Sequence, residues 1–129
     1  MYKILIVDDN EHNVQQVHSI LERYNYSSGF LLEPEYFFER LKYESFDIVL
    51  MDVHMPNIDG LTLLKKVKTD PDFDQIPIVM LTADDNEKVL KECFDAGATD
   101  FLKKPISELE LISRLKTIIA NAEYVKRIQ

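Results

Sequence analysis

Glycine, cysteine and tryptophan are scarce or absent in this chain, and the first two shortages exclude kinds of site. The 129 residues include three glycines, one cysteine and no tryptophan. Gly29, Gly60 and Gly97 stand too far apart to form GxGxxG or GxxxxGK[ST] loops, which excludes dinucleotide and P-loop nucleotide sites of those types. The single Cys93 cannot form an internal disulfide, and we interpret it as a helix-packing thiol.

Long apolar runs and an excess of basic residues are also missing. No run approaches the roughly 18 residues that a membrane-spanning helix requires, and the first residues do not have the form of a signal peptide. Fifteen basic residues stand against 23 acidic ones, which gives a formal net charge of −8. Such a field repels a phosphate backbone, so we expect a cytoplasmic protein that binds neither nucleic acid directly nor membranes.

The chain length fits one domain, and its apolar pattern predicts the fold class. Short, largely β-branched runs lie at 4–7, 48–51, 76–81 and 98–102, with a weaker one at 27–32. Each is followed by a segment with helical spacing of apolar residues. This alternation predicts an α/β fold, a (βα)₅ doubly wound parallel sheet with helices on both faces. We expect one domain over 1–122 and a helical extension over 123–129 that connects to an effector domain.

Several residues mark the ends of the expected helices. Ser107 and Glu110 form the pattern of a capping box at the start of the last helix. Gly97 ends the helix before it, and Asp59 can cap the helix that follows Gly60, where the turn needs a permissive backbone.

Acidic residues stand where the expected strands end. Asp8 and Asp9 follow the first strand and Asp52 follows the third, while Thr82 and Lys104 follow the fourth and fifth. In doubly wound sheets these carboxyl ends form the ligand crevice. Either acid of the first pair could instead cap the next helix, with Asn10 as a rival for that role.

Three converging carboxylates imply a divalent cation. One lysine cannot neutralise them all, and a site with oxygen ligands alone favours a hard ion, Mg²⁺ rather than Ca²⁺. A cation with Lys104 and Thr82 beside it is suited to a phosphoryl group. In the absence of a nucleotide loop, the central Asp52 is the natural nucleophile and would form an acyl phosphate.

Four motifs in order carry a resemblance to a known family. The segments are ILIVDDN at 4–10, DVHMPNIDG at 52–60, VMLTA at 79–83 and GATDFLKKP at 97–105. Together they resemble the receiver domain of two-component response regulators over residues 2 to about 122. The resemblance implies a flavodoxin-like sheet in the strand order 2-1-3-4-5. It also implies a signalling switch that catalyses only its own phosphorylation and dephosphorylation.

The resemblance further assigns roles to individual residues. Asp52 would take a phosphoryl group from a histidine kinase or phosphotransfer protein. Asp9, Asp52 and the backbone carbonyl of His54 would ligate Mg²⁺, with Asp8 acting mainly through water. Lys104, the Thr82 hydroxyl and the backbone N–H of Ala83 would contact the phosphoryl oxygens, and the bond between Lys104 and Pro105 would be cis.

By the same resemblance, Phe101 is the switch aromatic, three residues before the lysine. It would move inward as Thr82 moves toward the phosphate, and would change the face built by the fourth helix, fifth strand and fifth helix, through which a homodimer can form. Without that role, Phe101 is a half-buried strand aromatic. The neighbouring Lys103 and the two helical histidines, His12 and His18, are interpreted as solvated.

Two other functions compete with this hypothesis. Hydrolases of the haloacid dehalogenase type also use a strand-end Asp and Mg²⁺, but they expect a second Asp two residues later, where this chain has His54, and a cap insertion that the chain lacks. A receiver-like module that binds partners without phosphorylation would be expected to lose Asp52, one of the acidic pair or Lys104, and it has lost none of them.

Overall fold

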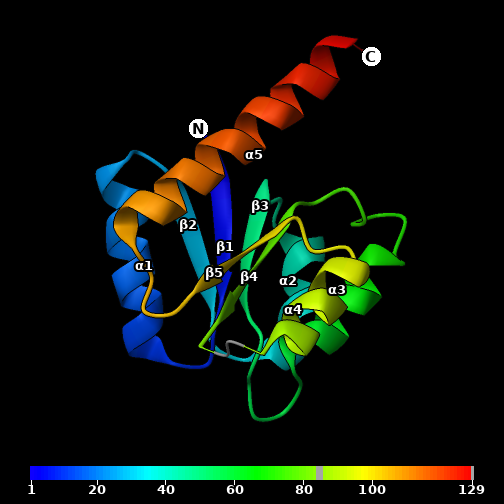
Figure 1. Cartoon of the computed structure of the whole chain (residues 1–129). Helices are drawn as coiled ribbons and strands as arrows, with labels where there is room; N and C mark the ends of the chain where they lie inside the picture. The colour runs from blue at the N-terminus through cyan, green and yellow to red at the C-terminus, as the bar shows by residue number, and fades with distance from the viewer. Residues whose placement is uncertain (84–85, 129) are drawn as a thin grey trace.

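A parallel β-sheet forms the centre of the computed structural model, which describes residues 1–83 and 86–128 (Figure 1). Within those residues the sheet has five strands in the order β2-β1-β3-β4-β5, and every neighbouring pair is parallel. The strands are β1 (Lys3–Val7), β2 (Ser27–Leu31), β3 (Ile48–Asp52), β4 (Ile78–Thr82) and β5 (Asp100–Lys103). The predicted α/β class is confirmed, and so is the strand order that the resemblance implied.

Helices cover both faces of the sheet, as doubly wound connections require. The amino-terminal and carboxy-terminal helices lie on one face and the middle ones on the other (Figure 1). In chain order they are α1 (Glu11–Arg23), a short 3-10 turn (Pro34–Tyr36), α2 (Phe37–Tyr43), α3 (Gly60–Lys68), α4 (Glu87–Asp95) and α5 (Glu108–Ile128). Helices α1 to α4 each lie on a connection from the carboxyl end of one strand to the amino end of the next, and α5 follows the last strand.

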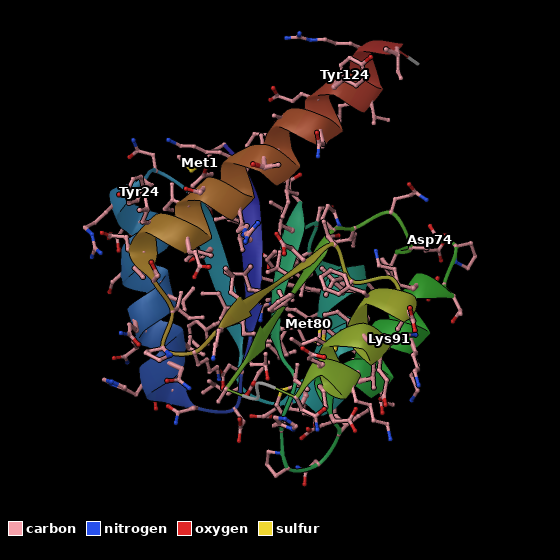
Figure 2. All side chains as sticks on the ribbon, in the orientation of Figure 1. Met1, Tyr24, Asp74, Met80, Lys91 and Tyr124 are labelled. Atoms are coloured by element: carbon pink, nitrogen blue, oxygen red, sulfur yellow. The ribbon has the colours of Figure 1, made fainter. Side chains whose placement is uncertain are left out.

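Two apolar layers form because successive strand residues point to opposite faces. On β1, Ile4 and Ile6 pack with α1 and α5, whereas Leu5 and Val7 pack with α2, α3 and α4. Met80 lies in the second layer, between the sheet and the middle helices (Figure 2). Burying each such side chain contributes roughly 1.5–3 kcal/mol, so the layers hold the strand ends in place.

The helix ends are formed by capping residues that can be recognised in the sequence. Asn10, rather than Asp8 or Asp9, caps α1, because its side chain accepts a hydrogen bond from the backbone N–H of Asn13. Asn25 and Gly97 follow the last residues of α1 and α4 with positive φ angles of 64° and 105°. At both places the N–H of this residue and the N–H of the next residue donate back into the last helical turn, which satisfies carbonyls that a helix end leaves open.

The strand boundaries differ from the prediction at β4 and β5. β4 begins at Ile78 rather than residue 76, because Pro77 has no N–H to donate to a neighbouring strand. β5 begins at Asp100 rather than residue 98, because the N–H of Ala98 is used to close α4 by donating to the carbonyl of Cys93. The edge strand β2 matches its prediction closely, and pairing with β1 supplies what its weak apolar pattern lacks.

The last turns of α5 extend beyond the sheet (Figure 1), and Tyr124 stands on them away from the core (Figure 2). The Tyr2 hydroxyl donates a hydrogen bond to Glu123, which ties this segment to the start of β1. The helical character predicted for 123–128 is present, whereas a domain boundary at residue 122 stays a prediction. Across the described ranges, no helix is both long enough and apolar enough to traverse a bilayer.

Gly97→Ala is expected to destabilise the protein by about 1–2 kcal/mol, because an L side chain is strained at positive φ. An added Cβ would also lie 3.0 Å from the side chain of Lys68. Urea unfolding measures the difference, with Asn25→Gly as the matched change at the end of α1. Asn25→Gly relieves strain instead and should cost no stability. Equal stability of Gly97→Ala and wild type would contradict the argument.

Candidate functional site

Parallel pairing brings four chemically active residues to one edge of the sheet. Asp8 follows β1, Asp52 and Thr82 are the last residues of β3 and β4, and Lys104 follows β5. β1 and β4 both pair with β3, so the residues at these ends lie side by side. The sequence prediction of a crevice at this edge is therefore confirmed in its geometry.

Three carboxylates converge there. One oxygen from each of Asp8, Asp9 and Asp52 can be chosen so that all lie within 4.8 Å of one another. Asp8 and Asp52 are only 1% and 6% exposed, whereas Asp9 faces the solvent. The cluster thus has a buried floor and an open side through which a small ion or a phosphodonor can enter.

Lys104 provides the positive charge of the site. Its Nζ lies 3.0 Å from Asp8 Oδ2 and 3.3 Å from Asp52 Oδ1. Its backbone N–H donates to the carbonyl of Thr82 over 2.7 Å, and the peptide bond to Pro105 is cis, as the resemblance implied. Lys103, the neighbour in sequence, ends β5 with an exposed side chain, so the predicted choice between the two lysines is supported by position.

Burial and like charge act together on Asp52. Desolvation is the largest cause that raises the pKa of this carboxyl above its ordinary value, and the Asp8 carboxylate raises it further. Lys104 and the backbone N–H of His54 lower the same pKa, the latter over 3.4 Å to Asp52 Oδ1. The net direction is upward, because the cost of burying the charged carboxylate outweighs the stabilisation that Lys104 provides.

The donor set fits a hard divalent cation. All side chains of the cluster offer carboxylate oxygen, which Mg²⁺ prefers over nitrogen or sulfur. The buried charge of Asp52 is the second sign, because a bound cation would offset the desolvation cost that raises its pKa. Asp8, Asp9 and Asp52 are thus the side chains that could hold the ion.

Gly60 supports the site for a different reason than the sequence suggested. We expected a permissive turn, but Gly60 is the first residue of α3, and the positive φ found for a glycine belongs to Gly97. A Cβ at Gly60 would lie 2.1 Å from the carbonyl oxygen of Asp52. Glycine is therefore required by close approach to the backbone of Asp52, while Asp59 caps α3 as predicted, accepting from Thr62 N–H over 2.7 Å.

Thr82 and Phe101 lie on the same face of the sheet. Residues 78, 80 and 82 alternate toward the layer of α3 and α4, and Phe101 pairs in register with Met80. Phe101 is half-buried and meets Phe94 of α4 edge to face, with ring centroids 5.5 Å apart. A movement of Thr82 toward the crevice would therefore leave space on the side where Phe101 stands.

Comparison with known proteins agrees with this arrangement. The model of the response regulator receiver domain matches residues 4–116. The chain belongs to this family. Response regulator PleD of Caulobacter vibrioides is 34% identical over 116 residues, which cover 90% of this chain and 26% of that protein.

Solved structures give the same result for the fold of this receiver domain. A putative response regulator from Chloroflexus aurantiacus J-10-fl has a TM-score of 0.87 at 34% identity, covering 92% of this chain and 98% of that one. The receiver domain of the sensor histidine kinase PA1611 from Pseudomonas aeruginosa PAO1 has a TM-score of 0.83 at 26% identity, with the same two coverages. In the latter structure a magnesium ion is coordinated in the active site cleft.

The family defines what this receiver domain does in general terms. Receiver domains are the signalling switches of two-component response regulators, and they receive phosphoryl groups from histidine kinases. The chain spans between 5% and 53% of the length of the curated relatives it matches. The predicted function class is therefore confirmed, and nothing found favours a hydrolase or a phosphorylation-independent module.

Sequence reasoning missed two contacts near the site and misjudged one histidine away from it. The N–H of Asn10 donates to Asp8 Oδ1 over 2.9 Å, which orients the carboxylate from the start of α1. The backbone link between Lys104 and Thr82 was also unforeseen, although strand alternation could have suggested it. His18 is exposed as predicted, but its Nδ1 lies 2.5 Å from Ser28 Oγ on β2, so it is not merely solvated.

Asp52→Asn should stabilise the metal-free protein at neutral pH. A raised pKa means that ionised Asp52 opposes folding, so its protonated form contributes stability at low pH that is lost as pH rises through the folded pKa, above 3.8. We expect the unfolding midpoint of the variant to exceed that of wild type at pH 7 by roughly 3–5 °C, equivalent to about 1 kcal/mol. The gain should vanish near pH 3.

Magnesium should reverse the order of the two proteins at pH 7. Because the ion binds the folded state alone, it raises the midpoint of wild type with concentration, and it should raise that of Asp52→Asn much less. Calorimetry with and without MgCl₂ at about 10 mM measures both effects. A lower midpoint for metal-free Asp52→Asn would show that the Asp52 charge stabilises the fold.

Proposed function

We propose that Asp52 is the phosphorylation site of this receiver domain. The observation that supports it is the position of the Asp52 carboxylate at the end of the central strand β3, within 3.3 Å of Lys104 Nζ and inside the acidic cluster. The donor is a phosphohistidine of a histidine kinase or phosphotransfer protein. One Asp52 oxygen forms a bond to phosphorus as the phosphorus–nitrogen bond breaks, and the histidine leaves with the electron pair and takes up a proton.

Metal binding is assigned to the acidic cluster. Asp9 and Asp52 would hold Mg²⁺ together with the backbone carbonyl of His54, and Asp8 would act mainly through water. Bound Mg²⁺ offsets the negative charge of the phosphoryl oxygens and of the carboxylates around them. The exposed Asp9 suits this role, because its carboxylate can meet an ion that keeps several waters.

Lys104, Thr82 and Ala83 would bind the phosphoryl oxygens. Before phosphorylation, Lys104 Nζ is held between Asp8 and Asp52, so it already stands beside the oxygen that reacts. The Thr82 hydroxyl and the backbone N–H of Ala83 follow at the end of β4, and each donates one hydrogen bond. These contacts would stabilise the transferring group and hold the product.

The switch runs from Thr82 to Phe101. As the Thr82 side chain moves toward the phosphoryl group, Phe101 turns inward from its contact with Phe94. The surface of α4, β5 and α5 changes in consequence, and a partner or a second receiver can bind there. The Lys104 backbone N–H donates to the Thr82 carbonyl, so the two residues proposed to meet the phosphoryl group are also joined through the backbone.

The wider setting is inferred from chemistry and from the relatives. We assign the protein to the cytoplasm, where two-component phosphotransfer takes place, and we assign residues 123–129 as a connector to an effector domain. The domain would act as a switch whose catalysis is limited to its own phosphorylation and dephosphorylation. The kinase and the output stay unnamed.

Incubation with a small phosphodonor and MgCl₂ should add one acid-stable, base-labile phosphoryl group, because an acyl phosphate is formed at Asp52. Intact-mass measurement before and after base treatment detects it. Asp52→Asn should carry no label, and Asp95→Asn, which changes an exposed acid on α4, should be labelled like wild type. A label that persists in Asp52→Asn would place the nucleophile elsewhere.

Lys104→Ala should still accept phosphate to some degree but should lose the response of β5 and α5, because the link from the phosphoryl oxygens to Thr82 is gone. Lys103→Ala should respond like wild type, since its exposed side chain points away from the crevice. Amide shifts of residues 86–115 with and without beryllofluoride compare the two variants. A response kept by Lys104→Ala and abolished by Lys103→Ala would refute the register of β5.

A further inference from the structure

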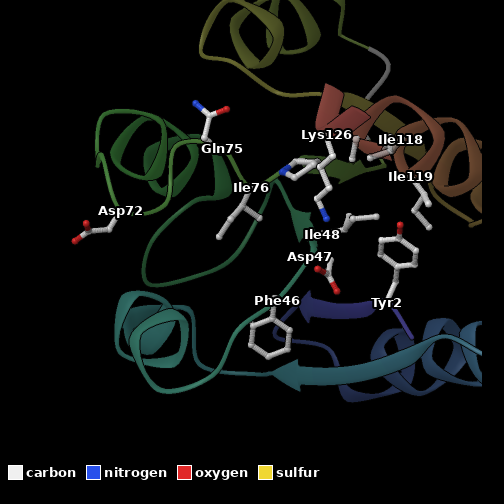
Figure 3. A pocket seen from close by; sticks show the side chains of 12 residues that line it. Tyr2, Phe46, Asp47, Ile48, Asp72, Gln75, Ile76, Ile118, Ile119 and Lys126 are labelled. Atoms are coloured by element: carbon white, nitrogen blue, oxygen red, sulfur yellow. The ribbon is translucent and has the colours of Figure 1, made fainter. Parts of the chain in front are cut away.

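The sheet borders a hollow at each of its ends. The hollow at the amino ends of β1, β3 and β4 has a volume of about 250 Å³ and mainly apolar walls, among them Phe46, Ile48 and Ile76 (Figure 3). The hollow at the carboxyl ends is smaller, about 60 Å³, and its lining includes Asp8 and Lys104 of the phosphoacceptor site. Side chains that line this smaller hollow are therefore placed to act on the site.

The charged groups of the site point to the face of the sheet that α1 covers. Asp8 comes two residues after Ile6, which packs in the layer of α1 and α5. Lys104 comes two residues after Leu102 of the same layer. Because strand side chains alternate between faces, Asp8 and Lys104 continue on that face, and the smaller hollow lies between them and α1. The first turns of α1 therefore stand beside this ion pair.

Two amide side chains of α1 line the smaller hollow. Asn13 and Gln16 are three residues apart, so they lie on one face of the helix, and both belong to the lining. Neither side chain is hydrogen-bonded to another residue within 1–83 or 86–128. The rest of the lining is apolar and consists of Val17, Leu81, Pro105 and Ile106. Two amides, each with donor and acceptor groups, thus border the same space as the ion pair.

The nearly buried carboxylate of Asp8 can accept more hydrogen bonds than its protein donors supply. A carboxylate accepts about four. Among the described residues, Asp8 Oδ1 accepts from the Asn10 N–H over 2.9 Å and Oδ2 from Lys104 Nζ over 3.0 Å. The smaller hollow, at about 60 Å³, exceeds the roughly 10–15 Å³ that one ordered water needs. Carboxylate, ammonium and amides around it supply the two to four polar partners that such a water requires.

We propose that Asn13 is a positioning residue of the metal site, whose side-chain amide, together with that of Gln16, holds water against the Asp8 carboxylate. The Asn13 amide donates to the water, and the water donates to Asp8, which is then held on a third side. The inference rests on the proposed function, in which Asp8 meets Mg²⁺ through water. An acid fixed by such outer partners binds a metal more tightly, because it loses less freedom when the ion arrives.

Magnesium titration of the unphosphorylated full chain, followed by amide shifts, is the test. Asn13→Leu keeps the size of the side chain but removes its polar groups, so it should raise the Mg²⁺ dissociation constant by about five- to tenfold. It should leave the metal-free unfolding midpoint no lower than that of wild type. Asn13→Ser, whose hydroxyl can hold the water, should restore most of the affinity. Gln15→Leu is the matched control and should bind like wild type, because Gln15 is an exposed amide of α1 outside this lining.

Crystal structures test the water itself. Wild type should show an ordered water within hydrogen-bonding distance of Asp8 and Asn13, and Asn13→Leu should lack it; a wild-type structure without that water would overturn the proposal. Wild-type Mg²⁺ affinity in Asn13→Leu, with affinity lost in Asp9→Asn, would overturn this inference alone. Unchanged affinity in both variants would overturn the metal assignment along with it. Neither measurement requires phosphorylation, so each result is distinct from a failure of Asp52 as the phosphoacceptor.

Discussion

Burial of the Asp8 and Asp52 carboxylates side by side is the constraint on which the rest of this receiver domain depends. Two nearly buried acids stand on neighbouring strands, and the cost of burying charge, which Lys104 offsets only in part, raises the pKa of Asp52. A packed fold keeps such a pair only when the surrounding structure holds it in place. The stability needed for this comes from the two apolar layers, which fix β1, β3 and β4 from both faces.

The same constraint explains why the edge of the sheet is built from backbone contacts. The Asn10 N–H orients Asp8, the His54 N–H reaches Asp52, and α3 approaches the Asp52 carbonyl so closely that only Gly60 fits. Backbone groups are fixed by the fold and lose no side-chain entropy when they bind. The carboxylates are thus held by backbone donors that the fold fixes. The groups that can move are a bound cation, the phosphoryl group and the side chain of Lys104.

In the proposed switch, the charge at the carboxyl ends of the strands would supply the energy for the change. Neutralising Asp52 by a cation, or changing its charge by phosphorylation, alters the forces on Lys104, and the Lys104 backbone is bonded to Thr82. Thr82 in turn shares a face of the sheet with Phe101, whose ring borders α4. In the proposed switch, these residues would carry a local electrostatic change from the site to the surface without rearranging the core.

How much the sequence alone determined depends on whether a feature is local. Periodicity gave the (βα)₅ alternation, and the residues after each apolar run gave the acids and Lys104, because a parallel sheet brings strand ends together by geometry alone. The strand order needed the family motifs, since no local pattern tells β2 from β4 as the neighbour of β1. Only the tertiary structure decided the start of β5, where the N–H of Ala98 is already used to close α4, whereas the start of β4 after Pro77 could have been predicted from residue type.

The tertiary structure likewise decided why residue 60 is glycine and which acid is buried. Asp8 and Asp9 are identical in sequence terms, but alternation along the chain turns one into the core and the other toward solvent. From the sequence, Gly60 is predicted to be a turn residue. In the structure, a Cβ added at Gly60 would lie 2.1 Å from the carbonyl oxygen of Asp52. Contacts of this kind join residues that are far apart in the chain or differ only in direction, and neither property is encoded in residue type.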